Sequence, residues 1–322
     1  MKILVYSFND KLGDGLQKIS FLQKLKKIYP SSFITYTTTN TTTLKSLLCP
    51  LLTNVIDEFI EENNIRSSLF DLFKNNLKFK NSHFDLIIDL QKVVLRTLNL
   101  KKISHKVFFS ASANFLFSDV KNNQNLKFKG IYIERFYYNI LSLINNEYFE
   151  DIENINVPYT EAPKIINQKN KKIIGIAPGA GNPIREWGFE KYLEVAKKLR
   201  QDDYRVVFFL GPNEKKYLDL CRTNNFDCPE WNEKSMISKS ILFIMNLAKQ
   251  VDCLLCNDGG TSWIFEFAGI KTFKIFGVTN EKKFARPNYC KTLQVKDFGY
   301  NSLQSFPTDL YIAELNNYLK TI

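Results

Sequence analysis

Short apolar runs alternate with longer amphipathic stretches along most of the chain. The runs have the length and the apolar content of strands that are buried on both faces of a sheet. They lie at residues 2–8, 33–37, 54–60, 84–90, 104–109, 173–177, 205–210, 253–256 and 272–276. Strands that alternate with helical patterns in this way are typical of a parallel α/β sheet.

The stretches between these runs carry apolar residues at helical spacing. In the first of them, Leu16, Ile19 and Leu22 fall on one face, and Lys18 is expected to point away from that face. Pro30 ends this helix. Further helices are expected at about 44–48, 64–79, 130–143, 188–200, 213–224, 240–249 and 308–319, with one more directly after the 253–256 strand.

The alternation is interrupted by a polar stretch and then starts again. Residues 145–170 are polar and contain Pro158 and Pro163, which indicates a linker between domains. We therefore expect two Rossmann-like domains of the α/β class, at 1–155 and 156–322, that face each other across a cleft. The last helix is a candidate to pack back on the first domain.

The composition of the chain says more about the kinds of partner it can bind than about its fold. The 322 residues are 44% hydrophobic, enough for a substantial core, and carry a formal net charge of +11. This charge permits anionic partners such as nucleotide phosphates or acidic lipids, and it is equally compatible with a lysine-rich solvated surface. Nucleic acid is disfavoured, because the chain has no recognised binding motif and no basic stripe interleaved with aromatic residues.

Cysteine and histidine give no indication of a disulfide framework or a metal site. Six cysteines are scattered over the chain, which favours a reducing compartment. Cys253 and Cys256 have metal-ligand spacing but lie inside an apolar strand, so core packing is the better interpretation, and His83 and His105 are best read as structural. The N-terminal apolar run is too short for a secretory signal and no run approaches a membrane span, so we expect a cytoplasmic protein.

Three loops hold the candidate chemistry, because ligands of open parallel sheets bind beyond the carboxyl ends of the strands. The first loop contains Gly13-Asp14-Gly15, where Asp14 is either a helix cap or a reactive carboxylate. It lacks the third glycine of a dinucleotide-binding fingerprint. The second loop, residues 177–188, combines a Pro-Gly-Ala-Gly turn with Arg185, a permanent cation whose alternative role is a surface pair with Glu186.

The third loop, Asn257 to Ser262, joins a buried strand to a helix. Gly259, Gly260 and Thr261 place free backbone N–H groups and the positive end of the helix dipole where a phosphate or diphosphate binds well. Thr261 or Ser262 is a candidate cap of that helix. Asp258 is either part of this site or an Asx turn before the helix.

Taken together, the three loops resemble those of glycosyltransferase family 9, the heptosyltransferase family of lipopolysaccharide assembly, and the resemblance spans nearly the whole chain. The matching segments are Leu12-Gly13-Asp14, Ala177-Pro178-Gly179-Ala180 with Arg185-Glu186-Trp187, Gly211-Pro212-Asn213-Glu214, and Asn257-Asp258-Gly259-Gly260-Thr261-Ser262-Trp263. Within the last segment Trp263, Thr261 and Gly259 replace the histidine, proline and threonine of the family. Arg185 stands where many relatives have lysine.

This resemblance implies a fold of the GT-B type and an inverting, metal-independent glycosyltransferase. The enzyme would move a heptose-like sugar from a nucleotide-diphosphate donor, with ADP-heptose as the leading candidate, to a lipopolysaccharide or other cell-surface glycan acceptor. Asp14 is implied as the general base, and Arg185 as the cation that stabilises the leaving group. The implied donor-binding residues are Pro178, Gly179, Glu214, Asp258, Gly259, Gly260 and Thr261.

The donor is a substrate, so neither a cofactor nor a metal is expected. The acceptor is expected to be lipid-linked or an oligosaccharide, which makes the cytoplasmic face of an anionic membrane a candidate contact. Two other readings stay open: a noncatalytic nucleotide or sugar binder of the same fold, which the change at Trp263 favours, and a nucleotide-sugar epimerase of similar architecture.

Overall fold

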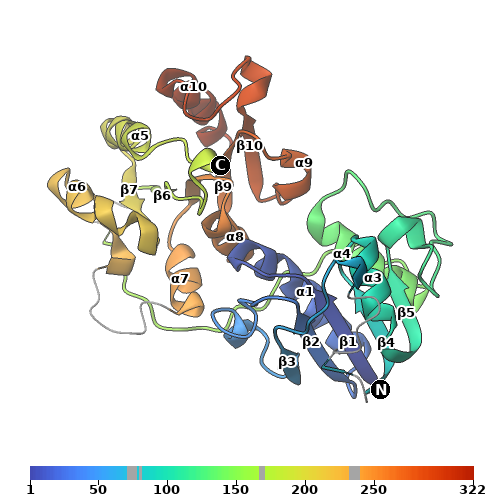
Figure 1. The fold of residues 1–322 in the computed structure, drawn as a ribbon. Helices are drawn as coiled ribbons and strands as arrows, with labels where there is room; N and C mark the ends of the chain where they lie inside the picture. The colour runs from blue at the N-terminus through green and yellow to red at the C-terminus, as the bar shows by residue number, and fades with distance from the viewer. Residues whose placement is uncertain (71–77, 80–81, 167–170, 232–239) are drawn as a thin grey trace. The chain divides into compact units, whose positions relative to one another are not determined.

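The computed structural model describes residues 1–70, 78–79, 82–166, 171–231 and 240–322. It divides into two compact units, Met1–Ile155 and Asn156–Ile322. Each unit is built on its own five-stranded sheet, in which every strand pair is parallel, with helices packed against it (Figure 1). The expected α/β class with two Rossmann-like halves is therefore confirmed.

The first sheet has the strand order β3-β2-β1-β4-β5. Its strands are β1 (Lys2–Ser7), β2 (Phe33–Thr38), β3 (Glu58–Ile60), β4 (His83–Asp89) and β5 (Ser104–Ser110), and the unit also contains α1 (Leu12–Ile28), η1 (Cys49–Leu51), α3 (Val94–Lys101), η2 (Ser112–Phe115) and α4 (Ile133–Asn145). The chain moves outward from β1 to β3 and then returns to the other side of β1 with β4. The carboxyl ends of β1 and β4 therefore form the topological switch point of this unit.

The second sheet has the strand order β10-β9-β8-β6-β7. The unit consists of β6 (Ile173–Ala177), η3 (Pro183–Arg185), α5 (Phe189–Gln201), β7 (Arg205–Phe208), η4 (Pro212–Tyr217), α6 (Leu218–Thr223), η5 (Pro229–Trp231), α7 (Ile241–Ala248), β8 (Cys253–Asn257), α8 (Gly260–Phe267), β9 (Lys271–Phe276), α9 (Glu281–Phe284), β10 (Cys290–Gln294), η7 (Val295–Phe298) and α10 (Thr308–Leu319). Here the strand order reverses between β6 and β8, so their carboxyl ends form the second switch point.

Several expected elements differ from the observed ones. Residues 44–48 form turns that precede η1, and the run at 54–60 is a strand only at β3. The expected helix 213–224 is divided into η4 and α6, which begins at Leu218. Of the expected helix 64–79, residues 64–68 are not helical, and 71–77 lie outside the described residues. Strand β10 was not expected, because its sequence, Cys-Lys-Thr-Leu-Gln, has no continuous apolar run. Only its leucine is buried in the structure.

The last helix, α10, follows the expected bounds but belongs to the second unit. Its buried residues Tyr311, Leu315 and Leu319 join the core cluster of that unit. The ring of Tyr311 stacks on that of Trp187, with the ring centroids 4.3 Å apart. The buried face of this helix is therefore used in the core of the second unit, and the expectation that the helix also packs on the first domain stays a prediction.

One buried carboxyl group makes the stability of the first unit depend on pH. Asp89 ends β4 and is fully buried. It accepts hydrogen bonds from the hydroxyl groups of Thr97 and Ser110, at 2.6 and 2.8 Å, and from the backbone N–H of Gln91 at 2.9 Å. Burial outweighs these hydrogen bonds and raises the pKa of Asp89 to about 6. The folded chain therefore binds this proton more tightly than the unfolded chain, whose aspartates have a pKa of about 3.9.

We expect Asp89→Asn to stabilise the protein increasingly as the pH rises. The contribution of Asp89 to the stability of the wild type falls between about pH 4 and pH 6, because Asp89 must ionise inside the core, and an asparagine has no such cost. The difference in unfolding free energy between variant and wild type should grow by roughly 2 kcal/mol over this range. Urea unfolding at both pH values measures it.

A matched control lies on the same strand. Asp85 accepts a hydrogen bond from the backbone N–H of Lys2 at 2.7 Å, which lowers the pKa of its carboxyl group. Its contribution to stability is therefore present above the unfolded-state pKa and lost as the pH falls, so Asp85→Asn should not gain stability with rising pH. If the two variants showed the same pH dependence, burial of Asp89 would not be its cause.

Candidate functional site

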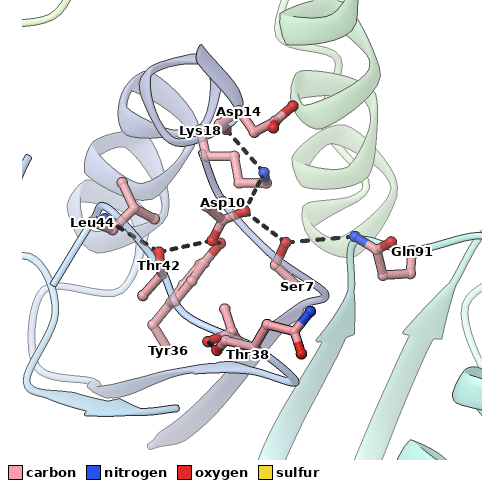
Figure 2. Close-up of polar contacts among 10 residues, drawn as sticks. Ser7, Asp10, Asp14, Lys18, Tyr36, Thr38, Thr42, Leu44 and Gln91 are labelled. Atoms are coloured by element: carbon pink, nitrogen blue, oxygen red, sulfur yellow. Dashed lines mark hydrogen bonds and ion pairs between the residues drawn. The ribbon is translucent and has the colours of Figure 1, made fainter. Parts of the chain in front are cut away.

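Asp14 lies at the first switch point, in the first turn of α1. The helix begins at Leu12, with Lys11 as its N-cap and no side-chain capping hydrogen bond. The helix therefore starts before Asp14, and the expectation that Asp14 caps it is wrong. An acidic residue in the first turn is favourable beside the positive end of the helix dipole. The side chain is exposed, and within the described residues its carboxylate makes no hydrogen bond or ion pair (Figure 2).

Lys18, one turn further along α1, is buried, although the sequence predicts that it points away from the apolar face of the helix. Its side chain is only 4% exposed and pairs with Asp10, whose carboxylate is fully buried, at 2.7 Å. Helix α1 is covered on more than one side, because Gln17, Lys18 and Ser20 are buried along with its apolar residues. The sequence pattern alone did not find this ion pair, although a polar Asp10 just beyond a buried strand was a usable signal.

At the second switch point the amide of Asn257 joins three segments. Its Oδ1 accepts hydrogen bonds from the backbone N–H of Trp187 and from the hydroxyl of Tyr192, both at 3.1 Å. Its Nδ2 donates to the carbonyl oxygen of Pro178. Asn257 ends β8 and Pro178 follows β6, so this buried amide holds the two candidate loops together. Asn257 had been identified only as part of a motif.

Two tight contacts involve glycines that the sequence placed at the donor site. A Cβ atom on Gly259 would lie 2.9 Å from the Cα of Ala180, so the two loops touch through their backbones. A Cβ atom on Gly179 would lie 2.4 Å from Cδ of Glu214, and one on Gly211 2.6 Å from Oε2 of the same residue. The structure thus brings Gly179, Glu214 and Gly259 into one region.

Arg185 and Asp258 form an ion pair in this region. Nη1 of Arg185 lies 3.7 Å from Oδ2 of Asp258, with the arginine side chain 41% exposed and the aspartate 6%. The alternative pairing of Arg185 with Glu186 is therefore not the one formed. Oδ2 of Asp258 has no hydrogen-bond partner within the described residues. Burial and the nearby charge of Glu186 raise the pKa of Glu214, against smaller opposing effects.

Helix α8 begins at Gly260, with Gly259 as its N-cap and no side-chain capping hydrogen bond. Thr261 and Ser262 lie inside the helix, so the expectation that one of them caps it is wrong. The hydroxyl of Ser262 instead donates to the carbonyl oxygen of Gly259 at 2.7 Å. An uncapped N-terminus next to Arg185 leaves backbone N–H groups that can bind an anion.

Trp263 points into the protein interior. It is 3% exposed, and the Nζ atom of Lys274 lies 4.9 Å from the centroid of its ring. Lys274 in turn pairs with Glu266 at 2.8 Å, and both side chains are fully buried. Trp263 is therefore a packing residue between α8 and β9, and its indole is not part of the surface around Gly259 and Gly260.

Neither a membrane span nor a metal cluster is found in the part of the chain that the structure describes. No helix there is long and apolar enough to cross a membrane. The same residues contain no group of three or more histidine, cysteine, aspartate or glutamate side chains placed to hold a metal ion.

Comparison with known proteins shows the family. The model of glycosyltransferase family 9 (heptosyltransferase) matches residues 73–296. Among proteins of curated function, none matches this sequence significantly.

Solved structures share the fold over almost their whole length. A glycosyltransferase of family 9 from Veillonella parvula aligns with a TM-score of 0.64 at 18% identity, covering 100% of this chain and 97% of its own. The E. coli heptosyltransferase WaaC, solved with ADP-2-deoxy-2-fluoro heptose, has a TM-score of 0.64 at 12% identity, covering 99% and 100%. E. coli ADP-heptose lipopolysaccharide heptosyltransferase II has a TM-score of 0.59 at 16% identity, covering 100% and 99%. The expected GT-B type of fold is thus confirmed.

The contact between Gly259 and Ala180 yields a stability prediction. We expect Gly259→Ala to lower the unfolding free energy by about 1–3 kcal/mol, because the added methyl group meets backbone that cannot move without separating the two loops. Gly211→Ala is the matched control, since its methyl group meets only the mobile end of Glu214 and should cost less. Equal losses in denaturant unfolding would contradict a backbone contact at Gly259.

Proposed function

The chain belongs to glycosyltransferase family 9, and on that premise we propose that it transfers a heptose-like sugar from a nucleotide-diphosphate donor to a lipopolysaccharide or other cell-surface glycan acceptor. The observation that carries this proposal is the convergence at the second switch point. Arg185, Asp258 and Gly259 meet there at the uncapped N-terminus of α8, with Glu214 beside Gly179.

The donor would bind at the second unit through its diphosphate. Backbone N–H groups at Gly260 and Thr261 would donate to the phosphate oxygens, and the guanidinium of Arg185 would add a mobile positive charge. Part of that charge is already directed at Asp258, so an incoming diphosphate would compete with this carboxylate for Arg185. Pro178 and Gly179 would line the same region, since the carbonyl of Pro178 is fixed by Asn257.

Glu214 would contact the donor ribose. Its carboxyl group lies against two glycines whose missing side chains leave room for it. A partly buried carboxylate is a good acceptor for the two hydroxyl groups of a ribose, because each can donate one hydrogen bond to it.

Transfer would proceed by a single displacement with inversion at the anomeric carbon. The acceptor hydroxyl attacks that carbon, and the bond to the diphosphate oxygen breaks with its electrons leaving on the nucleotide diphosphate. Asp14 takes the proton from the attacking hydroxyl as general base. The N-terminus of α8 and Arg185 stabilise the negative charge that develops on the leaving group. This scheme uses no metal and no cofactor.

The acceptor would be held by the first unit, which carries Asp14, and the donor by the second. A lipid-linked or oligosaccharide acceptor suits a cytoplasmic enzyme that contacts the anionic inner face of a membrane, and the net charge of +11 supports that contact. The side chain of Trp263 does not by itself support the alternative of a noncatalytic binder, because it is buried and packs on Lys274.

We expect Asp14→Asn to reduce sugar transfer by about 10²–10⁴-fold, the usual contribution of a general base. Because Asp14 is exposed, the variant should lose only the small stabilisation from the helix dipole. Asp309→Asn is the matched control, since Asp309 is an exposed aspartate in the first turn of α10. Transfer is measured as release of the nucleotide diphosphate. Wild-type turnover of the Asp14 variant would refute its role as base.

A thermal-shift panel with ADP, UDP, GDP and their sugars, including ADP-heptose, identifies the donor class. A ligand at 100 times its dissociation constant should add about 2.7 kcal/mol to the stability. For the nucleotide diphosphate that binds best, Arg185→Ala should weaken binding about 10-fold or more, because one charge-assisted contact is lost. Arg200→Ala, an exposed arginine on α5 that bonds to Asn224, should bind normally. No shift with any nucleotide would remove the support for a donor site.

A further inference from the structure

The buried ion pair of Asp10 and Lys18, next to the first turn of α1, is surrounded by further hydrogen bonds. Oδ1 of Asp10 accepts from the hydroxyl of Ser7 at 2.8 Å and from Nζ of Lys18 at 2.7 Å. Oδ2 accepts from the hydroxyl groups of Tyr36 at 2.8 Å and Thr42 at 2.9 Å (Figure 2). The carboxylate therefore has four donors and a single geometry, fixed by groups on β1, β2, α1 and the loop after β2.

Lys18 connects this fixed carboxylate to Asp14. Besides Asp10, its Nζ donates to the backbone carbonyl oxygen of Asp14 at 2.9 Å. The ammonium thus bridges the end of β1 and the residue whose side chain emerges from the first turn. Burial lowers the pKa of Lys18, but the charge of Asp10, with smaller effects of Tyr137 and Asp14, outweighs it and raises the pKa above its usual value. Lys18 is therefore charged at any physiological pH.

The backbone near Asp14 is held from the other side as well. The N–H of Thr43 donates to the carbonyl oxygen of Asp10 at 2.9 Å. Gly15 lies so close to this loop that a Cβ atom would be 2.7 Å from both Oγ1 of Thr43 and Cδ1 of Leu48. The first turn of α1 is thus locked between the buried pair and the loop after β2.

Stability alone does not explain two charges in this place. Burying an ion pair costs desolvation free energy that the attraction between its members only partly recovers, so neutral replacements of both members are often harmless. What a neutral pair could not do is hold a cation against the carbonyl of Asp14. That contact holds the backbone from which the side chain of Asp14 leaves the helix.

We propose that Lys18 and Asp10 are positioning residues for transfer, which orient Asp14 toward the attacking hydroxyl without touching substrate. This inference rests on the proposed function for the role of Asp14. A base that is displaced by about 1 Å can lose about 10²-fold in rate while substrate binding is retained. Loss of the pair should therefore lower kcat and leave KM for donor and acceptor within about twofold.

The test compares Lys18→Met, Asp10→Asn and the double variant. Each single variant leaves one buried charge unpaired and should lower the midpoint of urea unfolding, whereas the double variant removes both charges and should regain most of the loss. The double variant should nevertheless keep a kcat reduced by about 10–100-fold. Lys24→Met with Glu153→Gln is the matched control. It removes a partly exposed pair at 2.9 Å between Lys24 of the same helix and Glu153, which Lys27 also contacts, and kcat should not change.

A second measurement needs no substrate. The N–H of Gly15 donates to the carbonyl oxygen of Lys11 at 2.8 Å, and its hydrogen exchange should be at least 10-fold faster in the double variant than in the wild type and the control. Wild-type kcat in a stable double variant, or unchanged exchange in this turn, would overturn the positioning role. Faster exchange together with a wild type that transfers no sugar from any donor would instead refute the proposed function and leave the support of the turn intact.

Discussion

Parallel pairing of neighbouring strands is the constraint on which both candidate regions depend. Because β1 pairs with β4 and β6 with β8 in the same direction, the loops that follow each pair of strands emerge at one edge of the sheet. Residues that are far apart in the sequence, such as Pro178 and Asn257, meet there for this reason. The hydrogen bond from Asn257 to the carbonyl oxygen of Pro178 then fixes the positions of the two loops relative to each other.

The two switch points are stabilised by different means. In the first unit the support is a charged pair, Asp10 and Lys18, whose side chains are almost completely buried. Hydroxyl groups donate hydrogen bonds to the carboxylate of Asp10. In the second unit a neutral amide, Asn257, has the corresponding place, and the charged groups Arg185 and Asp258 stand at its edge. The neutral amide of Asn257 adds no fixed charge beside the region proposed to bind an anion. The pair of Asp10 and Lys18 likewise adds no net charge to the first unit.

The sequence predicted the class of fold and most elements, because buried parallel strands and amphipathic helices have distinct periods. It also placed Gly179 and Gly259 in candidate loops, and the family resemblance added Glu214; the structure brings the three together. It failed where burial contradicts residue type: Lys18 is expected to point away from the apolar face of its helix but is buried, because a pattern of residue types does not reveal which faces a neighbouring helix or strand covers. The predicted helix caps were wrong for a related reason, since backbone geometry and not the nearest polar side chain decides where α1 and α8 begin.

The backbone contact between Gly259 and Ala180 limits how this region can be redesigned. The two loops have no spare volume at that point, so enlarging a side chain there would push apart the ends of β6 and β8 and not reshape a pocket wall. Substitutions that leave the strand ends in place would have to be made at exposed positions of the same unit, such as Ile184 and Val278, whose side chains are 55% and 52% exposed. Libraries that spare Gly259 and vary such exposed positions would avoid the clash with Ala180.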